Sequence, residues 1–469
     1  MSILTPENCE RVYQNALTVL ETVGIAIDDQ PVLDLLLKKG AKAGSSSNHL
    51  LLPQGLVKDR LQCCPDTIKI GSRNGSLHTL GSQGGTVFWT GNALHVAEGR
   101  TNRELLSDDL ARLTRVAEAC PNVDGMVGTS IADYPAPARD FAGFQVMAHN
   151  TRKHLRPCIF TPTGATAILE EAEVLLGGQS IADNPIVSFG YSVVSPLHWS
   201  ATGIGVLRNT SGKKIPFMIN SEPMAGGTAP VTLAGCLVSG TAEVLSGIVI
   251  SQILEEGRPI VFNLGFAHIM DMTTAMALTG APENALLQAA GADLSRHFNL
   301  PSASWMSTEA MLVDGQAAFE KTLTGMAHTD NGVNIIWGIG NLEGTISMSA
   351  EMLVIDDEIV GALRHFKEGI VVNDENLALE SIQEVGLQGD FLSTDHTFDH
   401  FRETIRHTRL LTRSKRAVWE ETGRRTLEEK AAEQVEAILA TPCPELVEPE
   451  QSREIEKIVQ RYLEIVKDS

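Results

Sequence analysis

The stretch VNIIWGIG (333–340) is an apolar run of strand length that ends in glycines and follows the helical pattern QAAFEKTLTGMAH. Seven earlier runs have the same character and alternate with stretches of helical spacing. They are TVFW (86–89), GMVGTS (125–130), CIFTPT (158–163), IVSFGY (186–191), PFMIN (216–220), IVFNLGF (260–266) and SASWM (302–306). Eight strands that alternate with helices are typical of a closed barrel, and near-continuous apolar strands indicate burial on both faces. The sequence therefore predicts an α/β fold, a (β/α)8 TIM barrel over residues 86–372.

The alternative fold is a doubly wound open sheet. Its first βα turn would carry a GxGxxG pattern to bind a dinucleotide, and no such pattern follows TVFW. The barrel is therefore the favoured architecture.

Two extensions flank the predicted barrel. Residues 1–85 predict a helix over roughly 5–39 and then a small β-rich segment. Residues 373–469 predict a charged helical extension packed on the barrel. Its basic side chains are read as a solvated helix face, with docking of an acidic partner as the alternative. They are Arg402, Arg406, Arg409, Arg413, Lys415 and Arg416.

Composition and charge limit the classes of partner that the protein can bind. The net charge is −21, from 58 acidic and 37 basic residues, and such a surface repels nucleic acid and anionic lipid. The start MSILTPENCE lacks the basic and apolar regions of a signal peptide, and no apolar run reaches membrane-spanning length. We expect a cytoplasmic protein with no nucleic-acid or membrane partner.

Several kinds of active site are disfavoured. The seven cysteines form no CxxC pair, no HExxH pattern occurs, and no lysine ends a predicted strand. We therefore expect no metal site, no Schiff-base lysine and no other catalytic nucleophile.

Large aromatic residues fall where the predicted strands end. The C-terminal ends of barrel strands form the active-site face, and aromatic rings there can hold a permanent cation by cation–π contacts. The alternative is that the rings only cap the barrel core. The predicted cage is drawn from Trp89, Phe189, Tyr191, Phe266, Trp305 and Trp337.

Polar residues at the same face are candidates for binding an anionic group. In MAGGTAPVTLAG (224–235), Gly226 and Gly227 can present backbone N–H groups near a helix start, although such glycines are often only a loop. His268 is a candidate donor to a carboxylate. Glu222 could face the cation of a ligand or act as an acceptor behind the site.

Four longer stretches carry a resemblance to a known family. They are MAGGTAPVTLAGCLVSGTAEVLSGIVISQI, SPLHWS, GVNIIWGIGNLEGTISMSAEMLVIDDEI and ALESIQEVG. Together they resemble the trimethylamine methyltransferase superfamily, over essentially the whole chain. The resemblance implies a (β/α)8 barrel that passes a methyl group from a methylated amine to the cobalt of a small corrinoid protein. Archaeal members carry pyrrolysine just past the seventh strand, where this chain has Ser307 or Thr308, so it resembles the branch that lacks pyrrolysine.

Within that branch the resemblance is to the glycine betaine methyltransferases. It implies methyl transfer from glycine betaine to a Co(I)-corrinoid (cobalamin) held on a partner protein, releasing dimethylglycine, with no tightly bound cofactor. Ser307 and Thr308 join Gly226, Gly227 and His268 as candidates for binding the carboxylate. Another quaternary amine (carnitine, choline or proline betaine) and a non-catalytic betaine-binding barrel are the alternatives, and homo-oligomer formation is left open. Because a quaternary ammonium leaves as a neutral amine, the reaction needs no general acid.

Overall fold

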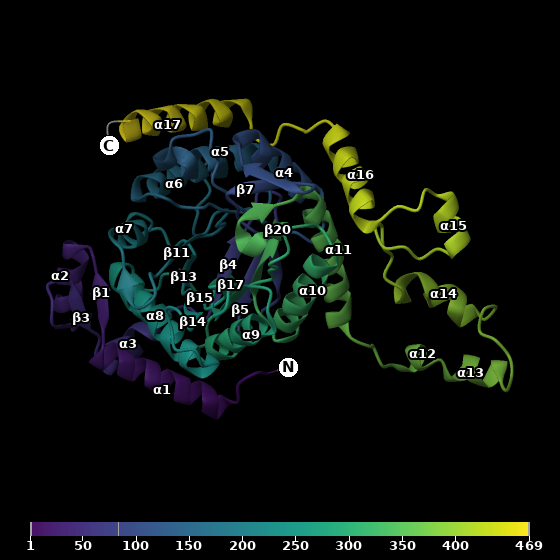
Figure 1. Ribbon diagram of the computed structural model, residues 1–469, viewed down its shortest axis with the longest axis horizontal. Helices are drawn as coiled ribbons and strands as arrows, with labels where there is room; N and C mark the ends of the chain where they lie inside the picture. The colour runs from purple at the N-terminus through teal and green to yellow at the C-terminus, as the bar shows by residue number, and fades with distance from the viewer. Residues whose placement is uncertain (1, 83, 468–469) are drawn as a thin grey trace.

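Eight parallel strands form a closed barrel at the centre of the protein (Figure 1). The computed structural model describes residues 2–82 and 84–467. The strands are β6 (Val87–Thr90), β9 (Gly125–Val127), β10 (His154–Arg156), β11 (Phe189–Ser192), β13 (Phe217–Asn220), β15 (Ile260–Asn263), β18 (Ala303–Trp305) and β19 (Ile335–Ile339). They pair in the order β10-β9-β6-β19-β18 and β11-β13-β15. Single bridges from Leu155 to Val187 and from Phe262 to Ser302 join the two sheets. The predicted TIM barrel is confirmed.

Each barrel strand is followed by a helix of the outer ring. The helices are α4 (Ser107–Ala119), α5 (Arg139–Asn150), α6 (Pro162–Leu176), α7 (Ala201–Asn209), α8 (Leu233–Leu254), α9 (Pro282–His297), α10 (Gly315–Asp330) and α11 (Ala350–Glu368). By length and composition α8 could cross a membrane, but 72% of its most apolar window is buried inside the protein, so it is a core helix. Thr232 caps its start by accepting a hydrogen bond from the Gly235 N–H.

The third strand lies earlier than the sequence predicted. Strand β10 is His154–Arg156, whereas most of the predicted strand CIFTPT (158–163) is a loop that ends at the N-cap of α6, Thr161. The strand was missed because it carries a histidine and an arginine, both buried, instead of an apolar run. Polar residues in a barrel strand point to a functional interior.

The N-terminal extension differs from the single helix predicted over 5–39. It consists of α1 (Pro6–Thr22), β1 (Ile25–Ile27), α2 (Gln30–Lys38), β2 (Lys42–Ala43), β3 (His49–Leu51), α3 (Gln54–Leu61), β4 (Thr67–Gly71) and β5 (Leu77–Gly81). Gly24 separates the two long helices because it adopts φ +78°, and an added Cβ would lie 2.1 Å from the carbonyl oxygen of Leu50. Strand β1 then pairs with β12 (His198–Trp199), which ties the extension to the barrel.

The hairpin β4–β5 closes the barrel at the N-terminal ends of its strands. Ile68, Ile70 and Leu80 join the apolar cluster that fills the barrel interior. The hairpin is also held by hydrogen bonds from its backbone to barrel residues: the Gly71 carbonyl bonds His154 Nδ1, and the Gly81 carbonyl accepts from Asn334 Nδ2. The opposite end of the barrel is therefore the open one.

Short strands surround that open end: β7 (His95–Glu98), β8 (Thr101–Glu104), β14 (Met224–Ala225), β16 (His268–Asp271), β17 (Met276–Leu278), β20 (Asn341–Leu342) and β21 (Ser347–Met348). They pair in two small sheets, β14-β16-β17 and β20-β21-β7-β8. These sheets build the rim of the candidate site.

The C-terminal extension has two parts. It contains α12 (Asp374–Leu377), α13 (Leu379–Val385), α14 (Asp395–Thr404), α15 (Arg416–Glu421), α16 (Leu427–Ala440) and α17 (Pro449–Lys467). Helix α16 packs on α11 and α4, and α17 packs on α6 and α5. Helices α12–α15 instead project sideways from the barrel as an arm (Figure 1). Helices α16 and α17 thus contact the barrel helices, and the division into three domains with boundaries at 86 and 372 stays a prediction.

A buried ion pair fixes the end of the last barrel strand. Lys321 Nζ of α10 lies 2.6 Å from Asp356 Oδ2 of α11, and neither side chain is exposed. Lys321 also donates to the Gly338 carbonyl, and Asp356 accepts from the Gly340 N–H. The pair therefore links two outer helices to the turn that follows Trp337.

We expect Lys321→Met to lower the free energy of unfolding by about 3–5 kcal/mol, because it leaves the Asp356 carboxylate buried without its partner. Urea denaturation measures the change. Lys457→Met, on the exposed face of α17, is the matched control and should change stability by less than about 0.5 kcal/mol. The expectation fails if the two variants are equally stable.

Candidate active site

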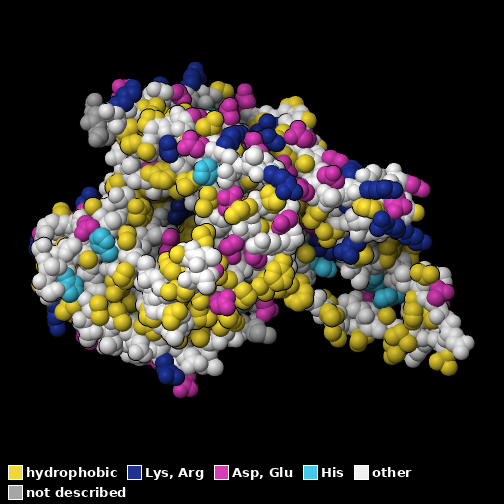
Figure 2. All heavy atoms as spheres, in the orientation of Figure 1, with side chains coloured by type: hydrophobic (Ala, Val, Ile, Leu, Met, Phe, Trp, Pro, Cys, Tyr) yellow, Lys and Arg dark blue, Asp and Glu magenta, His cyan; other side chains and the backbone are white. Residues whose placement is uncertain are grey.

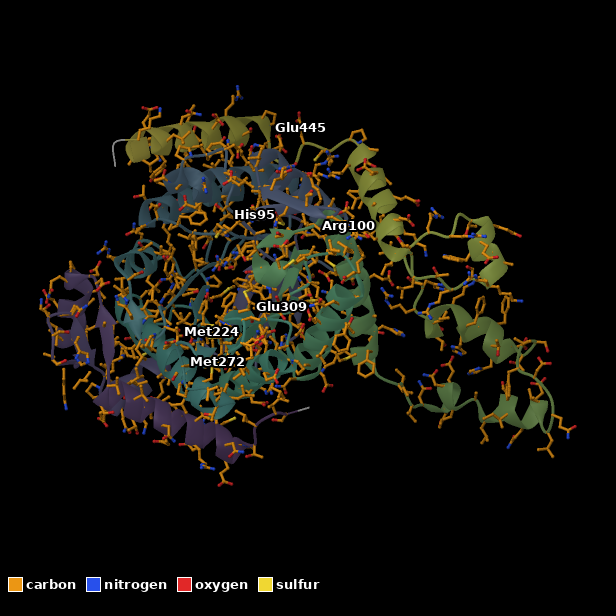
Figure 3. All side chains as sticks on the ribbon, in the orientation of Figure 1. His95, Arg100, Met224, Met272, Glu309 and Glu445 are labelled. Atoms are coloured by element: carbon orange, nitrogen blue, oxygen red, sulfur yellow. The ribbon has the colours of Figure 1, made fainter. Side chains whose placement is uncertain are left out.

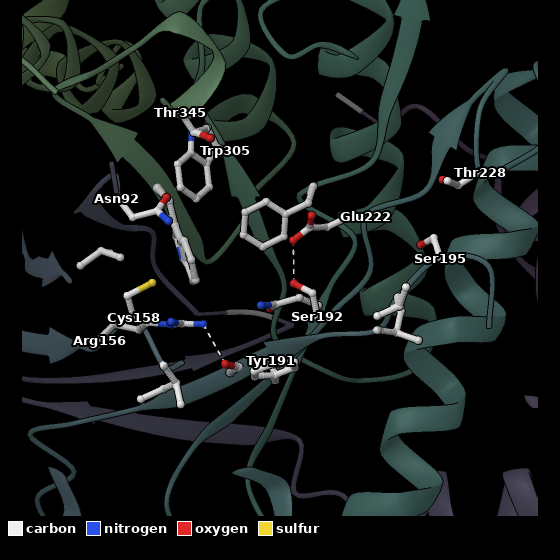
Figure 4. Close-up of a pocket in the computed structure, with 18 residues that line it drawn as sticks. Asn92, Arg156, Cys158, Tyr191, Ser192, Ser195, Glu222, Thr228, Trp305 and Thr345 are labelled. Carbon is white, nitrogen blue, oxygen red and sulfur yellow. Dashed lines mark hydrogen bonds between the residues drawn. The ribbon is translucent and has the colours of Figure 1, made fainter. Parts of the chain in front are cut away.

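A cavity of about 640 Å³ opens at the C-terminal ends of the barrel strands. The space-filling view shows the hollow near the middle of the barrel, with basic and acidic atoms deep inside it (Figure 2). Figure 4 shows the side chains around it. They are Asn92, Val127, Arg156, Cys158, Ile159, Gly190, Tyr191, Ser192, Val193, Val194, Ser195, Asn220, Glu222, Thr228, Phe266, Trp305, Trp337 and Thr345. The site lies on the face that TIM-barrel enzymes use.

Three aromatic rings of the predicted cage meet in this cavity. The ring centroids of Trp305 and Trp337 are 5.4 Å apart, and Phe266 lies 5.2 Å from Trp305 and 5.5 Å from Trp337. Trp89 lies one layer deeper, fully buried, 5.8 Å from Trp337 and stacked on His154. The structure thus brings four of the six predicted rings together, and three of them line the cavity.

The other two predicted rings lie apart from this cluster. Phe189 is buried in the core outside the barrel interior, and it does not line the cavity. Tyr191 lies two residues further along the same strand, so it turns to the same side and packs against Gly203 of α7. Tyr191 still belongs to the cavity lining, but it stands outside the cluster of three rings. Sequence position alone did not distinguish the two faces of β11.

The cavity wall contains a buried arginine that the sequence analysis missed. The Arg156 guanidinium carbon lies 5.0 Å from the centroid of the Trp337 ring. The side chain donates to the carbonyls of Pro157 and Gly190, at 2.5 and 3.0 Å. Gly190 permits this approach, because an added Cβ would lie 2.9 Å from a guanidinium nitrogen.

Among the described residues the Arg156 guanidinium donates only to these two carbonyls and to no carboxylate, and its buried Nε–H has no acceptor there. Burial lowers its pKa to about 10, so it stays charged at neutral pH. A buried cation of this kind is stabilised strongly by an anion that can accept two N–H bonds at once. The wall therefore offers a site for a carboxylate.

An acidic group faces the same cavity from another strand. Glu222 follows β13 and accepts a hydrogen bond from Ser192 Oγ at 2.6 Å. Figure 4 shows this pair and Arg156 on different sides of the cavity, with Trp305 above them. The cavity thus combines separated positive and negative groups with aromatic faces.

The predicted anion site at Gly226 and Gly227 is arranged differently. The N–H groups of Gly226, Gly227 and Thr228 all bond to carbonyls within the same turn, and α8 starts only at Leu233. Three methionines enclose the turn: Met224, Met270 and Met272. Figure 3 shows Met224 and Met272 close together there. The N–H groups of Gly226, Gly227 and Thr228 are therefore already used within the turn and are not free to bind an anion.

His268 is also turned away from the cavity. Its Nδ1 is hydrogen-bonded to the Phe266 carbonyl at 2.6 Å, and the residue does not line the cavity. Its observed role is to hold the loop that carries the Phe266 ring.

The described residues contain no group of three or more histidines, cysteines or acidic residues placed to hold a metal ion. All seven cysteines are free thiols. The charged groups that line the cavity are the Arg156 guanidinium and the Glu222 carboxylate, and the Cys158 thiol lines it as well.

Comparison with known proteins assigns the chain to a family. The trimethylamine methyltransferase (MTTB) family matches residues 1–465. The chain belongs to this family. It is 30% identical to the trimethylamine methyltransferase MttB of Desulfitobacterium hafniense, over 94% of this chain and 89% of that protein. It is 28% identical to a glycine betaine methyltransferase of Desulfitobacterium hafniense strain Y51, over 99% and 98%. The fold matches the Methanosarcina barkeri monomethylamine methyltransferase (MtmB), with a TM-score of 0.51, 11% identity, and coverage of 98% and 92%.

The chain is thus a methyltransferase of the MTTB family. Ser307 and Thr308, predicted as carboxylate-binding residues, lie in the loop after β18. Both are fully buried: Ser307 Oγ bonds Thr279 Oγ1, and Thr308 Oγ1 donates to Glu320. Neither residue lines the cavity, and their hydrogen bonds hold the loop after β18.

His154, buried beneath the cavity, makes the stability of the folded protein depend on pH. It stacks on Trp89 and is hydrogen-bonded to Ser188 Oγ. Burial lowers its pKa from 6.5 to about 4. As pH falls, the unfolded chain therefore binds a proton here before the folded chain does, and stability is lost between about pH 6.5 and pH 4.

We expect the wild-type protein to lose about 2–3 kcal/mol more unfolding free energy than His154→Gln between pH 7 and pH 4.5, since one pKa unit corresponds to about 1.4 kcal/mol. Urea denaturation of both proteins at each pH measures the difference. Parallel losses in the two proteins would show that His154 does not titrate in this range.

Proposed function

We propose that this MTTB protein transfers one methyl group from glycine betaine to the Co(I) of a corrinoid carried by a partner protein, releasing dimethylglycine. The observation that carries the proposal is the buried Arg156 guanidinium, without an ion-pair partner among the described residues, on the wall of an aromatic cavity. A substrate with both a carboxylate and a quaternary ammonium matches this wall.

The substrate is oriented by its two charges. The carboxylate binds the remaining N–H of Nη1 and of Nη2 of Arg156, because each of these nitrogens carries two hydrogens and donates to only one carbonyl. The trimethylammonium group lies against Phe266 and Trp305, with Glu222 near enough to the cavity to offset its charge. The face of Trp337 already has the Arg156 cation over it, so a second cation is disfavoured there unless a carboxylate neutralises the first.

This arrangement favours betaines over simple cations. Choline and tetramethylammonium carry no carboxylate, and in the cavity they would meet an uncompensated Arg156. The relatives do not choose between substrates, because the identities of 30% and 28% are nearly equal. A larger betaine, carnitine or proline betaine, is the second candidate, since a 640 Å³ cavity has room beyond one glycine betaine molecule.

The transfer balances without a proton donor. The Co(I) electron pair forms a bond to one methyl carbon, the C–N bond breaks, and its electron pair stays on nitrogen. The products are methyl-Co(III) and a neutral tertiary amine. The protein contributes by holding the methyl group in line with the cobalt. A modest cage is suited to this task, because the ammonium charge disappears along the reaction and strong binding of that charge would oppose transfer.

Corrinoid methylation tests the function. With Co(I)-cobalamin under anaerobic reduction, we expect glycine betaine, and not trimethylamine, to convert the visible spectrum to that of methyl-Co(III). A corrinoid protein is supplied if free cobalamin is unreactive. Conversion with trimethylamine would contradict the substrate, and no conversion with any amine would support a betaine-binding protein instead. The proposed location is the cytoplasm.

Substitutions of Arg156 and of Trp305 should separate the contribution of the carboxylate contact to binding from that of the aromatic cage. We expect Arg156→Met to weaken glycine betaine binding about ten- to hundredfold, the effect of losing a charged hydrogen-bonded pair of about 1.5–3 kcal/mol. Because the substitution removes a cation that would repel the choline ammonium group, the affinity for choline should stay equal or increase.

Trp305→Ala is the contrasting variant. It should weaken the binding of glycine betaine and of choline by a similar factor, since it removes a ring that contacts the ammonium group of both ligands. Isothermal titration calorimetry measures the affinities of glycine betaine and choline for the wild type and for both variants. Arg156→Lys shows whether a positive charge suffices without the planar, two-pronged guanidinium group. Equal losses of betaine and choline in Arg156→Met would remove the carboxylate role.

A further inference from the structure

The arm, residues 370–425, is a folded segment almost without a core of its own. Among its residues only Thr394 and Leu410 are buried. Large apolar side chains stand in solvent along it, with Leu387 98% exposed, Ile370 92% and Leu392 87%. Apolar exposure on this scale marks a surface that another molecule covers.

The arm is nevertheless ordered and attached. Thr394 caps α14 by accepting from the Thr397 N–H, and Glu375 pairs with His400 to join α12 to α14. Arg406 pairs with Glu358 of α11 and fixes the arm to the barrel. The arm therefore combines specific contacts within itself and to the barrel with exposed apolar residues, as a surface that binds a partner would.

A second apolar surface lies where the arm leaves the barrel. Helices α10 and α11 enclose a groove of about 410 Å³, which includes Met326, Ile359 and Phe366 and is bounded by Leu411 of the arm. Phe319 of α10, 67% exposed, extends this apolar surface along the helix. One chain therefore carries both a projecting apolar segment and an apolar groove.

The charges of the arm are divided along its length. Residues 370–401 contain seven acidic residues and no lysine or arginine, whereas 402–416 contain six basic residues and one acidic. Figure 2 shows the basic side chains gathered on the upper part of the projecting region and apolar ones below. Two such arms placed antiparallel would set the acidic half of each against the basic half of the other.

We propose that the arm binds a second copy of this chain. The two arms cross antiparallel about a twofold axis, as the self-complementary interface of a symmetric dimer requires. Acidic and basic halves pair, and the apolar side chains of each arm cover those of the other and the α10–α11 groove. The corrinoid protein is a poorer occupant, because it must reach the mouth of the barrel and the arm extends to the side (Figure 1).

Charge reversal tests this pairing on the full-length chain. Sedimentation velocity over a dilution series should give wild-type protein a mass of at least twice 50.5 kDa. A basic-half variant (Arg402→Glu, Arg409→Glu, Arg413→Glu) and an acidic-half variant (Glu380→Lys, Glu384→Lys, Asp399→Lys) should each sediment as a 50.5 kDa monomer. The combined variant restores complementary halves and should recover the oligomer.

A matched control carries three reversals on α17, Arg453→Glu, Lys457→Glu and Lys467→Glu, and should sediment like wild type. Circular dichroism checks that every variant is folded. A monomeric wild-type chain, an oligomer that both arm variants retain, or a combined variant that stays monomeric would overturn the proposal. Binding of a monomeric wild-type chain to the corrinoid protein through the arm would assign the surface to that partner instead.

Discussion

The site depends on the hairpin β4–β5, which closes the barrel at the N-terminal ends of its strands. The hairpin β4–β5 inserts Ile68, Ile70 and Leu80 beneath the strands, so the interior above them must be filled by side chains from the strands themselves. Trp89 occupies that layer, and Trp305 and Trp337 form the next. Because close-packed interiors leave few voids, the floor fixes the height at which the rings face the open end.

The barrel could be predicted from sequence because apolar residues form near-continuous runs in its strands and recur with helical spacing in its helices. The pattern SDDLARLTRVAEA coincides with α4, and seven of the eight apolar runs overlap barrel strands. The remaining strand, β10, was missed because two of its three residues are a histidine and an arginine, in a position that apolar residues usually occupy. The arm was missed because charged amphipathic helices look alike in sequence whether they pack on their own barrel or on another chain.

The site could be predicted only in part, for reasons of geometry. Strand ends located Phe266, Trp305 and Trp337, since a barrel brings those ends to one face. They could not show that Phe189 turns outward, or that the N–H groups of Gly226 and Gly227 are used within their own turn. The indole N–H groups of all three clustered tryptophans are buried without acceptors in the described part of the chain. Together with Arg156 they show that packing at this site departs from the rules of a stable core, as functional sites often do.

The hairpin β4–β5 also has a consequence for how the chain folds. Its Gly81 carbonyl accepts from Asn334, a residue 253 positions later that directly precedes the last strand. The hairpin is synthesised early, but the walls it is to close are complete only when β19 has joined β6. Contacts this distant in sequence are entropically costly to form and slow to appear. We therefore expect the floor of the barrel and its final strand to form in one late folding step, and the cavity above them to take shape only when nearly the whole barrel has been made.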